Sequence, residues 1–77
     1  MKKSLAARLN DAEIVVRFTY HSPKGDQPQK YETLRGEAKA LVQTINDLCP
    51  ESREKSLAIT KLEESIFWAN ASIARRE

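Results

Sequence analysis

Two amphipathic stretches that meet at a proline constrain the fold of this chain more than any other feature. The apolar positions of the first stretch are Tyr31, Leu34, Ala38, Leu41, Ile45 and Leu48. Those of the second are Ile59, Leu62, Ile66, Ala69 and Ile73. Both sets alternate steps of three and four, which is typical of a helix with one packed face. Between them, Pro50 interrupts the first helix and Ser52 suits the cap of the next. The short connection predicts that helices over 27–48 and 52–76 are antiparallel neighbours.

The residues before this hairpin follow a different pattern. We assign 1–16 to an N-terminal arm, in which Ser4–Asn10 forms a short helical turn or frays. Alternation of apolar and other side chains over Ile14–Tyr20 predicts extended chain. It is expected to pack on the helices or, as the less favoured alternative, to pair as a strand with another subunit. Residues 17–26 complete the extended segment and a loop, and Asp26 is the expected N-cap. The expected fold is one all-α domain over 1–77, a two-helix hairpin with a short N-terminal arm.

The short length of the chain favours assembly with further copies. Seventy-seven residues bury little apolar surface, and Cys49, the only cysteine, cannot form an internal disulfide. No Cys and His spacing of a zinc site occurs, since His21 and Cys49 are isolated. Phe67 and Trp68 lie off the main apolar face and point about 100° apart on a helix, so one partner helix cannot cover both. We therefore predict a homo-oligomer.

Charge and hydropathy exclude several classes of protein. There are 13 basic and 11 acidic residues, a net charge of +2, which does not favour binding to a DNA or RNA polymer. No apolar run reaches the roughly 18 residues of a membrane span. The segment from Met1 to Arg8 lacks the continuous apolar core of a signal peptide. A single thiol fits a reducing compartment, so we expect a cytoplasmic protein that does not engage membranes.

No group of residues in the sequence has the pattern of a catalytic site. Gly25 and Gly36 are the only glycines, which leaves no glycine-rich phosphate loop. His21 is the only histidine, and no nucleophile motif accompanies it. We expect a protein that is not an enzyme and that uses neither a metal nor a cofactor.

Cations and aromatic rings are the remaining candidates for function. Arg35, Lys39, Arg75 and Arg76 lie on the predicted helices, while Tyr20 and His21 lie where the arm meets the loop. Each charge taken alone is explained most simply as a solvated surface group. Together the residues suit a cyclic oligonucleotide, because guanidinium groups bind phosphate oxygens in pairs and a tyrosine ring stacks on a base.

Three stretches of the sequence carry a resemblance to a known family. They are Phe18–Gln27 with Tyr31–Arg35 (FTYHSPKGDQ and YETLR), Cys49–Glu63 (CPESREKSLAITKLE) and Phe67–Arg75 (FWANASIAR). In order and spacing they resemble the helical-hairpin domain shared by phage anti-CBASS cyclic-nucleotide sponges and some anti-Thoeris sponges. The resemblance covers residues 17–76 and leaves the first 16 outside.

The resemblance implies a hexamer that binds cyclic di- and trinucleotides between protomers and does not cleave them. Tyr20 would stack on a base, and Arg35 would hold a phosphate where relatives can have lysine. Arg75, with Arg76 as a one-residue alternative, would belong to a second kind of pocket. The expected function is sequestration of messengers such as cGAMP, which blocks activation of CBASS effectors in the host cytoplasm.

Two other functions fit the same residues. An amphipathic hairpin with an apolar surface at Phe67 and Trp68 could be a protein–protein adaptor or inhibitor that needs no nucleotide. A hairpin that binds nucleic-acid polymers is a third class, which the nearly balanced charge disfavours.

Overall fold

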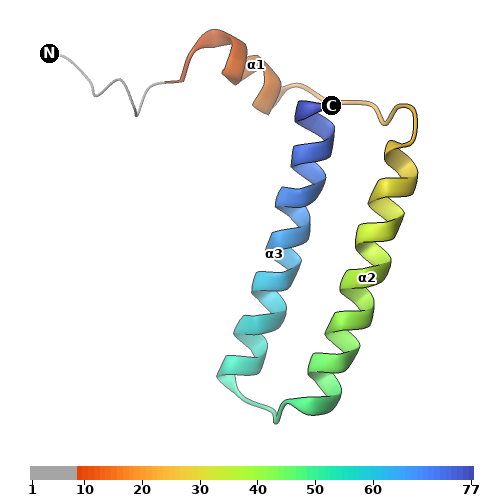
Figure 1. The fold of residues 1–77 in the computed structure, drawn as a ribbon. Coiled ribbons are helices and arrows are strands. Elements are labelled where there is room, and N and C mark those ends of the chain that lie inside the picture. The colour runs from red at the N-terminus through yellow and green to blue at the C-terminus, as the bar shows by residue number, and fades with distance from the viewer. Residues whose placement is uncertain (1–8) are drawn as a thin grey trace, which may run out of the picture.

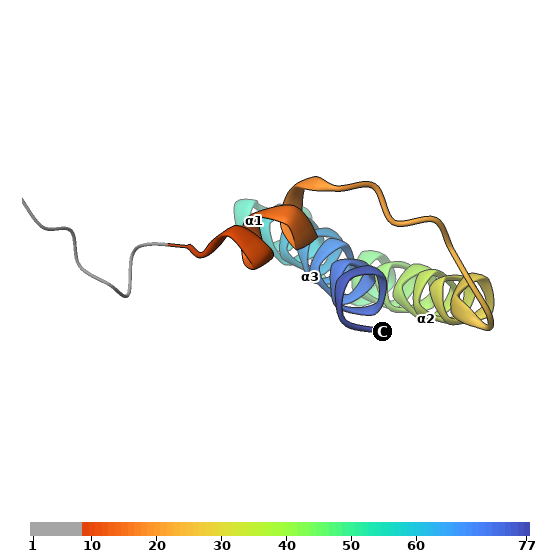
Figure 2. The same ribbon diagram turned by 90° about the horizontal axis from the view of Figure 1, so that it is seen from above.

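The computed structural model describes residues 9–77, which form three helices and no strand. These are α1 (Asp11–Phe18), α2 (Gln27–Leu48) and α3 (Arg53–Arg76). Helices α2 and α3 run antiparallel side by side, and α1 lies beside the C-terminal end of α3, on the side away from α2, so that the segment after α1 crosses the open end of the hairpin (Figure 1). Figure 2 shows α1 and the segment that follows it on the same side of the hairpin. The predicted all-α hairpin is confirmed.

Helix α1 corrects the prediction of extended chain over Ile14–Tyr20. The Asn10 side chain accepts a hydrogen bond from the Glu13 amide at 2.8 Å, which caps the helix. Glu13 lies in the first turn and pairs with Arg17 in the last, four residues on, at 2.7 Å. The cap and this pair favour a helix locally, whereas the apolar alternation over so few residues is compatible with either structure. The prediction for Ser4–Asn10 falls mostly on residues outside the described range.

Both ends of the hairpin are joined by a buried polar side chain. At the open end, Gln27 is 3% exposed, and its Nε2 donates to the Ile73 carbonyl of α3 at 3.2 Å. At the turn, Lys55 is 7% exposed, and its Nζ donates to the Asn46 carbonyl of α2 at 3.2 Å. Each bond pairs a helix carbonyl with a donor from the opposite helix, which fixes how the two helices align.

The residues that begin the two long helices differ in how they cap them. Ser52 caps α3 as predicted, since its side chain accepts from the Lys55 amide at 3.1 Å. Asp26 takes the N-cap position of α2, but its side chain makes no capping hydrogen bond, and Pro28 lies in the first turn. The turn before α2 needs Gly25, whose φ of +57° is in the left-handed region.

The apolar contact between α2 and α3 is shallow. All five predicted positions of α3 are half-buried. On α2 the prediction fails at Leu41, which is 48% exposed, because Val42 takes its place between Ala38 and Ile45. Leu48 is also exposed, at the end of α2. No apolar side chain within residues 9–77 is fully buried.

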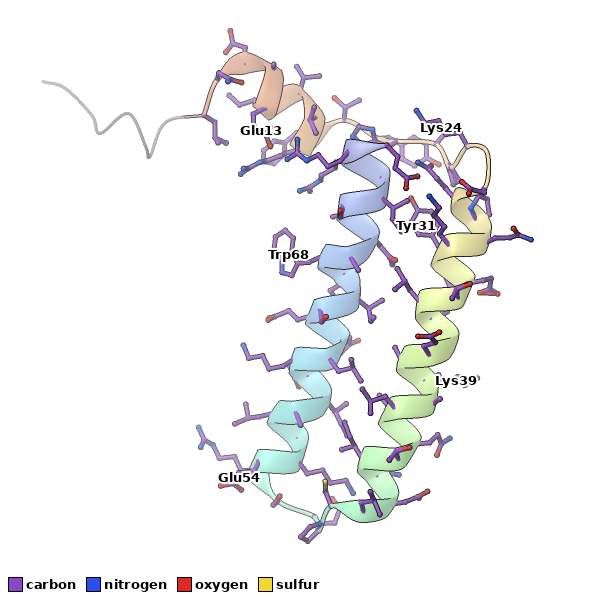
Figure 3. All side chains as sticks on the ribbon, viewed as in Figure 1. Glu13, Lys24, Tyr31, Lys39, Glu54 and Trp68 are labelled. Atoms are coloured by element: carbon purple, nitrogen blue, oxygen red, sulfur yellow. The ribbon has the colours of Figure 1, made fainter. Side chains whose placement is uncertain are left out.

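A single layer of helices accounts for this lack of a core. The chain is only 14 Å thick along its shortest axis, and its radius of gyration is 17.1 Å. A compact domain of this length has a radius of gyration of about 11 Å. One layer cannot enclose side chains on both of its faces, so large aromatic residues stay exposed. Figure 3 shows Trp68, for example, pointing away from α2.

None of the described helices combines the length and the apolar composition that crossing a membrane requires.

Candidate functional site

A hollow of about 450 Å³ lies where α1, the segment after it, α2 and α3 meet. We call it the junction hollow. Its lining residues are Arg17, Thr19, Tyr20, His21, Tyr31, Arg35, Phe67, Asn70, Ala71, Ala74 and Arg75. The fold thus brings together four of the six residues that the sequence singled out. The volume is in the range of small-molecule sites, about 300 to 1,000 Å³.

Tyr20 and His21 enter the junction hollow from the segment between α1 and α2. The Tyr20 side chain is 82% exposed, so its ring is free to stack on a flat ligand. His21 is half-buried, and its Nε2 lies 2.8 Å from the Val16 carbonyl in α1. That carbonyl is one of the last in α1 and lacks a partner within the helix. His21 therefore joins the segment to α1 and holds the adjacent Tyr20 in place.

Arg35 comes from the third turn of α2. Its guanidinium pairs with Glu32 on the same helix, and both side chains are largely exposed, at 63% and 72%. An exposed pair of this kind contributes on the order of 0.5 kcal/mol or less, so an incoming phosphate can displace Glu32 from Arg35.

Lys39 does not reach the junction hollow. It lines a neighbouring hollow of about 480 Å³ along the hairpin, between α2 and α3, which we call the hairpin groove. Figure 3 shows Lys39 further along α2 than Tyr31. Arg35, Phe67 and Asn70 line both hollows. Lys39 and Tyr20 therefore line different hollows, and Arg35 lines both.

Arg75 and Arg76 have different surroundings although they are adjacent. Arg76 donates to both carboxylate oxygens of Glu13, from Nη1 at 3.2 Å and from Nη2 at 2.7 Å. Hydrogen bonds from Arg76 and Arg17 lower the pKa of Glu13 to about 2. Arg76 thus attaches α1 to α3. Arg75 lines the junction hollow and also a hollow of about 580 Å³ beside Trp68, the Trp68 hollow.

The sequence did not single out several residues that line the junction hollow. Arg17 was placed in extended chain, and Tyr31 was assigned only to the apolar face of α2. Asn70 gave no signal beyond being polar next to Ala69, yet its Oδ1 is buried with no hydrogen-bond partner. The position of Arg17 could have been found from the Glu13–Arg17 spacing, had the cap at Asn10 been recognised.

The charged residues that line the junction hollow are all arginines. The lining holds three guanidinium groups and no carboxylate, while Glu13 and Glu32 pair with Arg17 and Arg35 from outside the lining. Two of its lining residues are tyrosines, which supply flat apolar faces. Such a site suits a ligand with phosphate groups and stacked rings. Within residues 9–77, no three His, Cys, Asp or Glu residues gather closely enough to hold a metal ion.

Comparison with known families decides which class of protein this is. The family model described as the Acb2/Tad1 hairpin domain matches residues 10–74. The chain belongs to the Acb2/Tad1 hairpin-domain family. The match confirms the resemblance to anti-CBASS and anti-Thoeris sponges, a family of binding domains and not a known enzyme family. It begins before α1, so this Acb2/Tad1 domain includes the whole of a helix of which the resemblance covered only the last two residues. No curated protein and no solved structure matches the chain.

Proposed function

We propose that this Acb2/Tad1 domain is a phage anti-defence sponge that binds cyclic oligonucleotide messengers in the host cytoplasm and so keeps CBASS effectors inactive. The observation that supports it most is the meeting of Tyr20, Arg35 and Arg75 around one hollow that contains no acid. Arginine side chains pair with phosphodiester oxygens, and the exposed Tyr20 ring stacks on a purine. Cyclic dinucleotides such as cGAMP bind at Tyr20 and Arg35, and cyclic trinucleotides bind beside Arg75.

The ligand is held and not cleaved. Hydrolysis of a phosphodiester calls for a general base or for carboxylates that hold metal ions near the reacting phosphorus. The lining of the junction hollow contains no carboxylate, and the Nε2 of its histidine is bonded to the Val16 carbonyl. The chemistry available there is ionic pairing and stacking.

The sponge works as a homo-oligomer, a hexamer, in which a second copy completes each site. The exposed fractions of Phe18, Phe67 and Trp68 are 81%, 62% and 66%. Covering the Phe67 and Trp68 side chains alone would contribute on the order of several kcal/mol per copy. A second copy is the simplest source of that cover, because each copy exposes the same apolar surface.

Native mass spectrometry and calorimetry with a panel of cyclic di- and trinucleotides test the proposal. We expect a hexamer that releases heat on binding, and intact ligand when the protein is denatured afterwards. A linear or hydrolysed product would contradict sequestration.

The adaptor function keeps one observation in its favour, the exposed surface at Phe67 and Trp68. An adaptor gives no heat with any cyclic nucleotide, so the same titration separates the two functions.

A further inference from the structure

Where α1 meets α3, there are more guanidinium groups than carboxylates to pair with them. Three guanidinium groups, from Arg17, Arg75 and Arg76, line the Trp68 hollow. Among the described contacts, Glu13 is the carboxylate that pairs with two of them. Three guanidinium groups and one carboxylate leave an excess of two positive charges, which attracts an anion to this surface.

The hydrogen bonds at Glu13 determine which guanidinium groups remain available. Arg76 uses both of its Nη atoms on Glu13. Arg17 uses its Nε, which donates to Oε2 of Glu13 at 2.7 Å. Glu13 therefore orients Arg17 through the Nε edge and makes no bond with the two terminal nitrogens of that guanidinium. Those nitrogens match a pair of phosphate oxygens.

Arg17 and Arg75 share their surroundings. Both line the junction hollow, which contains Tyr20, and both line the Trp68 hollow. They come from different helices, and the Arg17 side chain is 43% exposed. An anion between them would be approached by α1 on one side and by α3 on the other.

We propose that Arg17 is a phosphate-binding residue, which acts with Arg75 as a two-sided clamp on one phosphodiester of a cyclic oligonucleotide. The bond between Glu13 and Arg76 presents Arg17 to this clamp by holding α1 on α3. The inference rests on the proposed function and adds to it a residue of α1 and the chemical group it contacts. A purely structural Arg17 needs only one bond to Glu13, whereas the clamp needs that bond and two further donors at once.

Calorimetry on four proteins tests this difference: the unchanged chain, Arg17→Ala, Arg17→Lys and the control Arg53→Ala. Arg53 begins α3 at the opposite end of the hairpin, so its variant removes the same charge away from the clamp (Figure 1). Each protein is titrated with cGAMP and with a cyclic triadenylate, at low and at high salt. Circular dichroism checks that the helix content is retained.

We expect Arg17→Ala to weaken the better ligand about tenfold and to reduce the salt dependence of binding. Arg17→Lys should recover less than half of that loss, because an ammonium that pairs with Glu13 has no fork of two parallel donors to offer a pair of phosphate oxygens. The control should stay within about twofold, well below the tenfold step of a lost ionic contact. Wild-type affinity in Arg17→Ala, or full recovery in Arg17→Lys, would overturn the clamp while leaving sequestration intact.

If the unchanged chain binds no cyclic nucleotide, a second ligand is needed to test the Arg17–Arg75 clamp separately from sequestration. Inorganic pyrophosphate is then added while the side-chain Nε signals of the arginines are followed by NMR. Shifts at Arg17 and Arg75 but not at Arg53 would support the anion clamp although the sponge function had failed. Equal or absent shifts would overturn both.

Discussion

The two ends of the hairpin use the same kind of contact and differ in what else they carry. At the turn, buried Lys55 donates to the Asn46 carbonyl, and Ser52 caps the following helix. At the open end, buried Gln27 donates to the Ile73 carbonyl. Among residues 9–77, the open end alone also carries α1, the junction hollow and the arginines that line it. The turn end shows what the fold requires, and the additional groups at the open end are the ones that the proposed ligand binding would use.

This comparison explains why the cationic side chains of the hairpin have different roles. Lys55 donates a hydrogen bond to a carbonyl at the end of α2, and Arg76 pairs with a carboxylate of α1, so both side chains hold elements of the fold together. Arg35 has a partner, Glu32, that a ligand can displace at little cost, and Arg75 lines two hollows. Positive charge near a candidate site therefore does not by itself identify a binding residue. The partner that each group would lose on binding is the better guide.

The largest effect we expect is on stability at the turn end. Lys55→Ala removes the buried ammonium and leaves the Asn46 carbonyl without its donor, which lowers the free energy of unfolding by about 2–3 kcal/mol. Urea denaturation at a fixed protein concentration measures the change. Lys61→Ala, which removes a largely exposed ammonium paired with Glu64, is the control and should change little. Equal loss in both variants would show that the Lys55 contact adds nothing to the fold.

Variants at the open end should reverse this pattern. Tyr20→Ala and Arg35→Ala each remove a largely exposed side chain, so stability should change little. Binding of a cyclic dinucleotide should weaken by about 1–3 kcal/mol in each, from lost stacking and a lost ionic bond. Calorimetry checks both, and Arg75→Ala serves as the comparison because it should affect cyclic trinucleotides more. Normal dinucleotide binding in both variants would remove Tyr20 and Arg35 from the site.

The sequence was sufficient to predict the hairpin because the signals that form it are local. Steps of three and four between apolar residues, Pro50 and the cap at Ser52 all act within a few residues. The error at Leu41 has the same origin. Leu41 and Val42 are both apolar, and a step of three or of four from Ala38 is equally regular, so only the packed structure distinguishes them.

The candidate site was less predictable because it depends on where α1 lies. Tyr20, Arg35 and Arg75 were predicted from the family motifs and do line one hollow. The roles of Arg17 and Arg76 depend on both meeting Glu13, and Arg76 is 63 residues away from it. The extended chain expected over Ile14–Tyr20 excluded that arrangement. Because the cap at Asn10 was not recognised, α1 was not predicted, and neither were the contacts of Arg17 and Arg76 with Glu13.

A smaller effect is expected at Asn70, inside the hairpin. Its Oδ1 is buried without a hydrogen-bond partner, so Asn70→Leu should raise the free energy of unfolding of the ligand-free protein by about 1 kcal/mol. Leucine also favours helices more than asparagine does, by a few tenths of a kcal/mol. Asn46→Leu, at an exposed position of α2, corrects for that gain. If the two variants are stabilised equally in urea, the Asn70 oxygen has a partner in solution.

The smallest effect should appear only in acid, and only at the open end. The pKa of Glu13 falls from 4.5 to about 2 because Arg76 and Arg17 donate to its carboxylate. A carboxyl whose pKa is lowered by folding stabilises the fold above its unfolded pKa, and that contribution is lost as the pH falls through the folded value. Attachment of α1 to α3 should therefore be complete above pH 4.5 and weaken as the pH approaches 2.

Amide NMR signals of Ile14 and Val15 report on α1, and those of Ile59 report on the turn end. Glu13→Gln should show a loosened α1 already at neutral pH, with no further step in acid. If both proteins lose the α1 signals at the same pH, the bond between Glu13 and Arg76 does not hold the helix.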